Sequence, residues 1–227
     1  MAQRVILSPN AEEGKLFPYS QNMDAGPGLT SRRKAQTARE IAQVASELFA
    51  TQGVAGVTAA EIAATAGVSL RTFYRYFATK EDAVAPILEI GAARWQSAFA
   101  EASGDLATAI PGIIADQLTP SSAEEGEALA GMRPLLRALA EDRELRAVWD
   151  RVNHESELRL TELVLERGGD RFDARLLAAA ATESIRIGLE EWAAGDASLD
   201  GDGSPASLAV RAFEALAPSD PGRRLVV

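Results

Sequence analysis

Apolar residues recur along this chain at intervals of three and four positions, the spacing that places them on one face of an α-helix. Ile41, Val44 and Leu48 begin one such series, and Leu145 and Val148 belong to a later one. Beyond residue 80 the sequence has no run of alternating β-branched residues of the kind that marks a strand. The pattern predicts an all-α protein. A chain of 227 residues, 47% of them hydrophobic, can bury the core of one large or two small domains.

Glycine, proline and polar residues divide these series into separate helices. A first helix is expected from position 39 to Gly53, and two short ones follow over 59–66 and 70–77. Pro86 and Pro111 fall inside later helices, so a bend or a displaced helix start is expected at each. The helices predicted beyond residue 79 cover 80–102, 105–118, 123–140, 143–167, 173–195 and 204–217.

Polar residues also stand where helix N-termini need side-chain partners. Thr58 and Glu61 have the spacing of a capping box, in which a hydroxyl and a carboxylate each bind an otherwise unpaired amide. Ser69 can cap the next helix, and Thr79 with Asp82 can cap the one after it. Later in the chain, a mostly small-residue seam would let another helix approach closely. It consists of Leu177, Ala181, Ser184, Gly188 and Trp192.

Residues 59–78 have the spacing of a helix-turn-helix. Ile62, Ala63 and Phe73 supply apolar groups where the two short helices face each other, and Gly67 permits the turn. Arginine side chains bind guanine edges or phosphates, and tyrosine and threonine hydroxyls bind phosphate oxygens. On spacing alone, an arginine-rich corner that touches no DNA is the alternative. The outward-facing residues, which we expect to meet DNA, are Leu70, Arg71, Thr72, Tyr74 and Arg75.

Charge is distributed unevenly along the chain. Residues 28–85 carry seven basic and five acidic side chains, whereas 86–227 carry fourteen and twenty-five, and the net charge is −10. A locally positive segment joined to an acidic body suits a DNA-contacting module on a regulatory domain, and random scatter is the alternative. The expected organisation is a flexible extension at 1–30, a helix-turn-helix domain at 31–80, a helical regulatory and dimerisation domain at 81–218, and a tail at 219–227. Met23 is an alternative start.

Several classes of protein are disfavoured. With no cysteine, the chain has no disulfide framework, thiolate metal site or cysteine nucleophile, which suits a reducing cytoplasm. The longest uncharged stretch, 48–60, is well short of the ~20 apolar residues that span a bilayer, so no membrane contact is expected. The single histidine lacks a paired nucleophile signature, and no catalytic residue, metal site or cofactor is expected. Acid–base chemistry by carboxylates is left open.

The stretch 45–80 resembles the N-terminal domain of the TetR family of transcriptional regulators. The resemblance rests on Ala-Gly-Val-Ser at 66–69, Phe-Tyr-Arg-Tyr-Phe at 73–77 and Lys80. It implies a homodimer formed through the last two helices, with two recognition helices in successive major grooves of a pseudo-palindromic operator. It also implies a repressor that a small-molecule effector releases. By this resemblance, the outward residues of 70–75 line the groove, and phosphates are held by Thr58, Ser69, Tyr76 and Lys80.

Three points within this module are open at the level of sequence. Leu70 stands where the family often has a polar residue, so it can only touch a thymine methyl or cover a sugar. Lys80 lies at the first turn of a predicted helix, whose positive end also attracts phosphate. Arg32, Arg33 and Lys34 precede the first predicted helix and form either an arm into the minor groove or a solvated basic run.

The body is longer than dimerisation requires, and in the TetR family this part usually holds an effector pocket. For each aromatic residue singly, core packing is the alternative. The segment 174–193 is similar to a TetR subgroup with an acyl-CoA-like ligand-binding domain. A helical protein-interaction module that retains the three-helix head without operator binding is the alternative for the whole chain. The expected pocket, for an effector with a large apolar part, is formed by Trp95, Phe99, Met132, Trp149, Asn153 and His154.

Overall fold

The computed structural model describes residues 29–217, and within that range every regular element is helical. The all-α prediction is therefore confirmed. Of the extension expected over 1–30, residues 1–28, including Met23, lie outside the described residues, as does the expected tail over 219–227, whereas residues 29 and 30 belong to α1. The elements are α1 Leu29–Gln52, η1 Val54–Gly56, α2 Ala59–Thr65, α3 Leu70–Tyr76, η2 Glu81–Val84, α4 Ala85–Glu101, α5 Leu106–Leu118, α6 Ala123–Ala138, α7 Arg143–Glu166, α8 Arg171–Ala194 and α9 Pro205–Leu216, where η marks a 3₁₀ turn.

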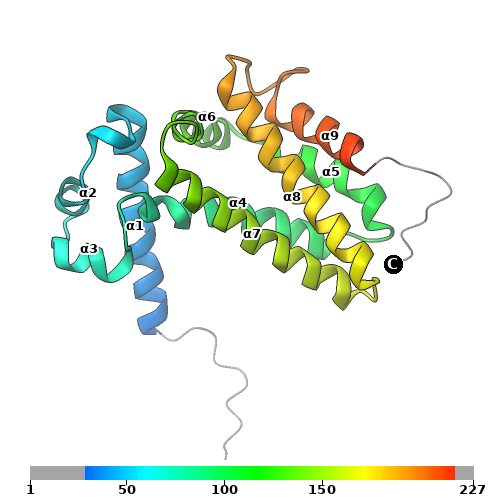
Figure 1. Ribbon diagram of the computed structural model, residues 1–227, viewed down its shortest axis with the longest axis horizontal. Coiled ribbons are helices and arrows are strands. Elements are labelled where there is room, and N and C mark those ends of the chain that lie inside the picture. The colour runs from blue at the N-terminus through cyan, green and yellow to red at the C-terminus, as the bar shows by residue number, and fades with distance from the viewer. Residues whose placement is uncertain (1–28, 218–227) are drawn as a thin grey trace, which may run out of the picture.

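The helices form a small head and a larger body (Figure 1). Helices α1, α2 and α3 make the head, and α4 to α9 make the body. In the body, α8 packs against both α7 and α9, and α4 packs against α7. The head meets the body where α1 contacts α4, α6 and η2. None of the helices in the described residues combines the length and the apolar composition that a membrane span requires.

The head is built around apolar side chains that its sequence pattern already placed on inner faces. Ile41, Ile62 and Phe73 are fully buried, and Phe49 and Phe77 are nearly so. Gly67 ends α2 in the left-handed region, with φ of 69°, and the Val68 amide donates to the Ala63 carbonyl oxygen at 2.9 Å. This turn confirms the role expected of Gly67 and sets the angle between α2 and α3.

Helix α1 begins at Leu29, ten residues before the predicted start. The prediction that Arg32, Arg33 and Lys34 precede the first helix is therefore wrong, because these residues lie in the early turns of α1 with exposed side chains. The apolar periodicity used to predict helices does not extend to residues 32–36, because their side chains are exposed and do not face the core. Arginine, lysine, alanine and glutamine are good helix formers, and that propensity accounts for the extension.

The start of α4 is displaced, as expected of a proline near a helix end. Pro86 lies in the first turn of α4, where the lack of an amide hydrogen costs little. The preceding residues, 81–84, form η2 instead of the first turn of a helix that begins at 80. Lys80 therefore precedes η2 and does not lie on α4, which corrects its predicted position. Pro111 lies inside α5, which continues through it.

Helices α8 and α9 approach each other closely along the predicted small-residue seam. Leu177, Ala181, Ser184, Gly188 and Trp192 are all buried. A Cβ atom added at Gly188 would lie 2.6 Å from the Cβ and backbone nitrogen of Ala209 on α9. At Gly188 the seam is thus occupied by α9 of the same chain. Because the nearest atoms include the backbone of Ala209, α9 leaves no room for a side chain at this position.

Gly188→Ala is expected to destabilise the protein by about 1–3 kcal/mol, because the new methyl group must push α9 away. The free energy of unfolding should be measured by urea titration, followed by helical circular dichroism at fixed protein concentration. The matched control is Gly91→Ala in α4, where an added Cβ meets open space. Removing that glycine should stabilise the helix by up to about 1 kcal/mol. Equal effects of the two substitutions would contradict the close α8–α9 packing.

Candidate nucleic-acid interface and body cavity

Helix α3 has one buried face and one exposed face, and its N-terminus is capped. The Ser69 hydroxyl accepts from the Thr72 amide at 3.1 Å and donates to the Thr72 Oγ1 at 2.9 Å. Phe73 is fully buried, and its ring lies 5.5 Å from the ring of Phe77. A helix of seven residues is not stable alone, so this cap and these rings hold it in place.

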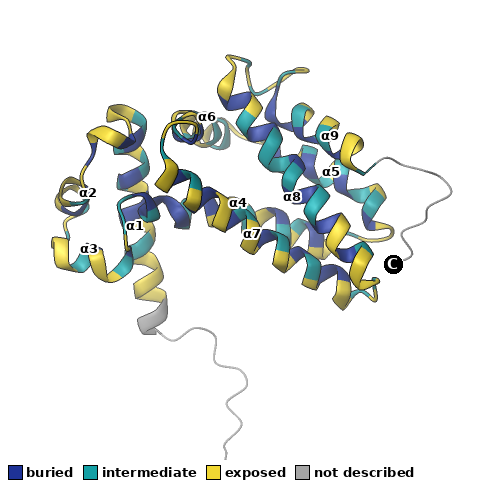
Figure 2. Ribbon diagram, viewed as in Figure 1, coloured by how far each residue is buried: buried dark blue, intermediate teal, exposed yellow. Residues whose placement is uncertain are grey.

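The opposite face of α3 points to solvent, as predicted (Figure 2). Leu70 and Tyr74 are 42% and 54% exposed, large values for such side chains. Arg71 and Arg75 are exposed as well, and Thr72 is half-buried. The guanidinium of Arg75 lies 5.4 Å from the centre of the half-buried Tyr76 ring, a cation–π contact that restricts both side chains. Two arginines, a threonine hydroxyl and a tyrosine hydroxyl are thus presented together.

Thr58 and Glu61 form the predicted capping box at the N-terminus of α2. The Thr58 hydroxyl accepts from the Glu61 amide at 3.2 Å, and the Thr58 amide and hydroxyl each donate to Glu61 Oε2 at 2.8 Å. These bonds from Thr58 hold the pKa of the Glu61 carboxyl below its usual value. Both donors of Thr58 are engaged inside the head, so its predicted phosphate contact would require the hydroxyl to turn away from Glu61.

Lys80 directly precedes η2, and its side chain is half-buried. Its ammonium donates to the Val54 carbonyl oxygen, lies 3.3 Å from Glu81 Oε1 and sits 5.7 Å from the centre of the Phe49 ring. It therefore ties η1 and α1 to η2. An ammonium group has three hydrogens, so Lys80 can still donate a hydrogen bond to another acceptor. Its contact with a phosphate stays a prediction.

The six residues predicted to form an effector pocket are dispersed in the body. Trp95 and Phe99 are buried in contact with each other, with ring centres 6.0 Å apart. The Trp95 indole donates to Ser156 Oγ at 3.3 Å. Met132 is half-buried and His154 is exposed. The first two aromatic residues act as core packing in this structure, the alternative that the sequence left open.

Trp149 and Asn153 lie together on α7. The Asn153 amide donates to the Trp149 carbonyl oxygen at 2.8 Å, and the Trp149 indole donates to Glu190 Oε1 at 2.7 Å. Burial raises the pKa of Glu190, but hydrogen bonds from Arg146, Trp149 and Arg186 outweigh this and hold it below its ordinary value. The indole of Trp149 is thus part of a charged cluster that joins α7 to α8. An effector pocket around the six residues stays a prediction.

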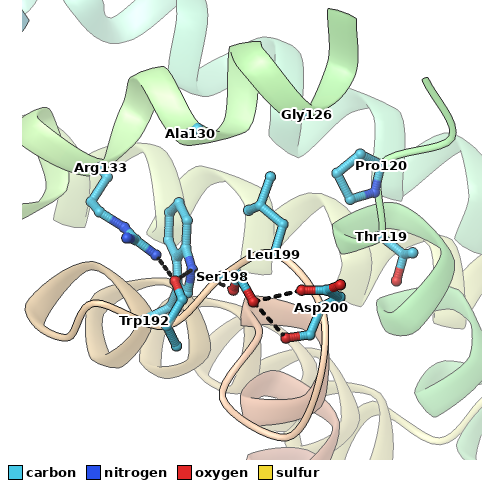
Figure 3. Close-up of a pocket in the computed structure, with 10 residues that line it drawn as sticks. Thr119, Pro120, Gly126, Ala130, Arg133, Trp192, Ser198, Leu199 and Asp200 are labelled. Carbon is cyan, nitrogen blue, oxygen red and sulfur yellow. Dashed lines mark hydrogen bonds between the residues drawn. The ribbon is translucent and has the colours of Figure 1, made fainter. Parts of the chain in front are cut away.

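A hollow of about 580 Å³ lies elsewhere, where the loop after α8 faces α6 and the residues that follow α5 (Figure 3). Leu199 points from this loop toward α6. The α6 residues that line the hollow beside it include Gly126 and Ala130, whose small size leaves space between the helix and the loop. At one end the guanidinium of Arg133 lies 3.9 Å from the centre of the Trp192 ring and donates to the Ala197 carbonyl oxygen. The residues that line the hollow are Thr119, Pro120, Gly126, Ala130, Arg133, Trp192, Ala197, Ser198, Leu199 and Asp200.

The sequence pattern placed Trp192 in the small-residue seam of the helix expected over 173–195, and it gave no sign of this hollow. Trp192 is 1% exposed, so it does belong to the core, yet its indole also forms a wall of the hollow. The loop lies where the expected helices 173–195 and 204–217 leave a gap between them. No periodic pattern shows where such a loop folds back, so residues that it brings to α6 could not be anticipated.

Comparison with known proteins identifies relatives of both parts. Residues 41–85 match the family model described as bacterial regulatory proteins of the tetR family. The HTH-type transcriptional regulator TcmR of Streptomyces glaucescens is 30% identical over 183 residues, which cover 77% of this chain and 81% of TcmR.

Solved structures share the fold. A crystal structure from Mesorhizobium loti, assigned to the TetR family of transcriptional regulators, has a TM-score of 0.51 at 21% identity. It covers 81% of this chain and 96% of that one. The fatty acid degradation regulator FadR of Bacillus halodurans has a TM-score of 0.51 at 18% identity, with 81% and 95% of the two chains covered.

The capping box makes the stability of the head depend on pH. Because the pKa of Glu61 is lower in the folded state, its contribution is present above its unfolded pKa and is lost as pH falls through its folded pKa, below 4.5. Glu61→Gln should therefore lower the urea midpoint at pH 7, and the difference from the wild type should shrink progressively as the pH falls below 4.5. Glu47→Gln, an exposed change in α1, is the control. A difference that stays constant down to pH 3 would show that the Glu61 charge has no such role.

Proposed function

This chain belongs to the TetR family of bacterial transcriptional regulators, and we propose that it acts as a ligand-responsive repressor that binds a pseudo-palindromic operator as a homodimer. The observation that carries the proposal is the exposed face of α3, where Arg71, Tyr74 and Arg75 project from a helix fixed by Ser69 and Phe73. Such a helix fits the major groove of duplex DNA. In a symmetric dimer, two of them must lie about 34–36 Å apart, one turn of the duplex.

Within this proposal, the residues of the head divide between base reading and backbone contact. Arg71 and Arg75 are placed to bind guanine edges, and Leu70 offers an apolar surface to a thymine methyl. The hydroxyl of Thr72 accepts from Ser69, which leaves its own hydrogen for a phosphate oxygen. The remaining proposed DNA contacts are Thr58, Ser69, Tyr74, Tyr76 and Lys80.

The dimer is proposed to form through α8 and α9. The inner seam of α8 is occupied by α9 of the same chain, so a second protomer must pack on the outer faces of these helices. Phe172 and Leu176, one turn apart near the start of α8, are 65% and 48% exposed, and Leu216 at the end of α9 is 50% exposed. Two-fold symmetry would present each of these apolar side chains twice in one interface.

The effector is proposed to be a small molecule with a large apolar part that binds the body. The hollow beside Leu199 supports this with apolar surface from Trp192, Pro120 and Ala130, next to the charged groups of Arg133 and Asp200. Suppose that an effector binds 10²-fold more tightly to an arrangement of the heads that does not fit the operator. It would then shift the equilibrium between the two arrangements by about 2.7 kcal/mol. A shift of that size releases most of the protein from its operator.

Arg71→Ala is expected to weaken operator binding by about 1–3 kcal/mol and to relax the preference at one base pair, because a bidentate contact with guanine is lost. The operator should first be recovered from random duplexes with the wild-type protein. Fluorescence anisotropy with each single-base variant of that operator then gives the affinity and its dependence on sequence.

Arg143→Ala is the matched control for Arg71→Ala, because Arg143 is an exposed arginine at the start of α7, in the body. Its operator affinity should equal that of the wild type. If Arg71→Ala leaves affinity and base preference unchanged, or if both variants weaken binding alike, Arg71 does not read the sequence.

Leu176→Glu is expected to raise the dimer dissociation constant at least tenfold, because burial of each leucine contributes about 1.5–3 kcal/mol and the symmetric interface contains two. Sedimentation velocity over a concentration series measures this directly. The control is Ile90→Glu on α4, where the isoleucine is equally exposed, at 48%. A dimer that survives Leu176→Glu, or that dissociates with Ile90→Glu, would place the interface elsewhere.

A further inference from the structure

An ion pair joins η2, the short segment between the head and α4, to helix α7 of the body. Asp82 in η2 accepts from the Arg151 guanidinium of α7 at 2.7 Å, across 69 positions of sequence. The other carboxylate oxygen of Asp82 accepts from the Thr79 amide at 3.1 Å, and the Asp82 amide donates back to the Thr79 hydroxyl at 3.1 Å. Both oxygens of the carboxylate are thus engaged, which fixes the direction from which Arg151 must approach.

The η2 segment packs against α1 of the head. Ala83 and Val84 are fully buried, and the half-buried Lys80 ties Val54 to Glu81. Because η2 packs on α1 and Lys80 links it to η1, a displacement of η2 would be transmitted to the head. A contact made to η2 from the body therefore acts on the recognition helix without touching it.

Arg151 lies where three elements meet. Besides pairing with Asp82 on η2, Arg151 acts on Glu89 of α4. Burial and the charge of Glu155 raise the pKa of Glu89 above its ordinary value, and the charge of Arg151 partly offsets that rise. The neighbouring Val152 is buried in the body core, so the backbone at this point of α7 is anchored. One guanidinium from the body thus faces the two elements that lead from the head, η2 and α4.

We propose that Asp82 and Arg151 are positioning residues that set the angle of each head relative to the body, and through it the distance between the two recognition helices. The proposal rests on the proposed function, because an angle matters only if two heads must fit one duplex together. A head without this ion pair still folds and still fits one half-site. It samples a wider range of angles, so the pair of heads no longer selects one half-site spacing.

The experiment compares the wild type with Arg151→Gln, Asp82→Asn and the double variant on three kinds of duplex. These are the selected operator, the same operator with one base pair added or removed between half-sites, and a single half-site. Since a partly exposed ion pair contributes up to about fivefold and a dimer has two, each single variant should lose about 5- to 20-fold affinity for the operator. Its spacing preference should flatten, and its half-site affinity should stay the same.

Two further variants test the assignment to this ion pair. The double variant should bind no more weakly than either single one, since both remove the same contact. Arg151→Lys, which keeps the charge, should recover most of the affinity and the spacing preference. The control is Arg159→Gln on the same helix, where the arginine pairs with Glu162 at 2.9 Å within α7, and it should behave as the wild type.

The outcomes separate this proposal from the function on which it rests. If the wild type recovers no duplex, the proposed function fails and this proposal fails with it. If the wild type binds its operator and Arg151→Gln keeps both affinity and spacing preference, only the positioning role is wrong. Equal losses on the operator and on the single half-site would show a damaged head, and would also overturn the positioning role.

Discussion

The burial of Phe73 against the rest of the head is the contact on which the proposed function depends. A helix as short as α3 does not persist in water alone, so its outer face is defined only while its inner face is held. Phe73 and Phe77 supply that hold, and the Ser69 cap and the turn at Gly67 fix its direction. The backbone that carries the surface arginines is then already in place to meet a rigid partner, which lowers the entropic cost of binding.

The two parts of the molecule differ in charge. The segment 28–85 is slightly basic, while the remainder carries a large excess of acid and would be repelled by a nucleic acid. In the proposed function, repulsion of the body and attraction of the head would together orient the chain with α3 toward DNA. Contacts through η2 and α4 connect the two parts, and in the proposed function they are the route by which a change in the body would reach the head.

Local rules predicted most of this fold, and its long-range contacts were not predictable. The capping pairs Thr58–Glu61 and Thr79–Asp82, and the turn at Gly67, act over a few residues and could be found by spacing. The early turns of α1 lack an apolar face and were therefore missed. The meeting of Arg151 with Asp82, and the fold of the 195–204 loop against α6, depend on how helices stack in space, which no periodicity encodes.

Selection from a random duplex pool tests the central claim most directly. The full-length wild-type chain should be incubated with the pool at low ionic strength, and the retained duplexes sequenced. The account predicts two inverted copies of one half-site, centred about one helical turn apart, with retention that falls steeply as salt rises. Retention of no duplex, or of duplexes without a shared inverted motif, would contradict it.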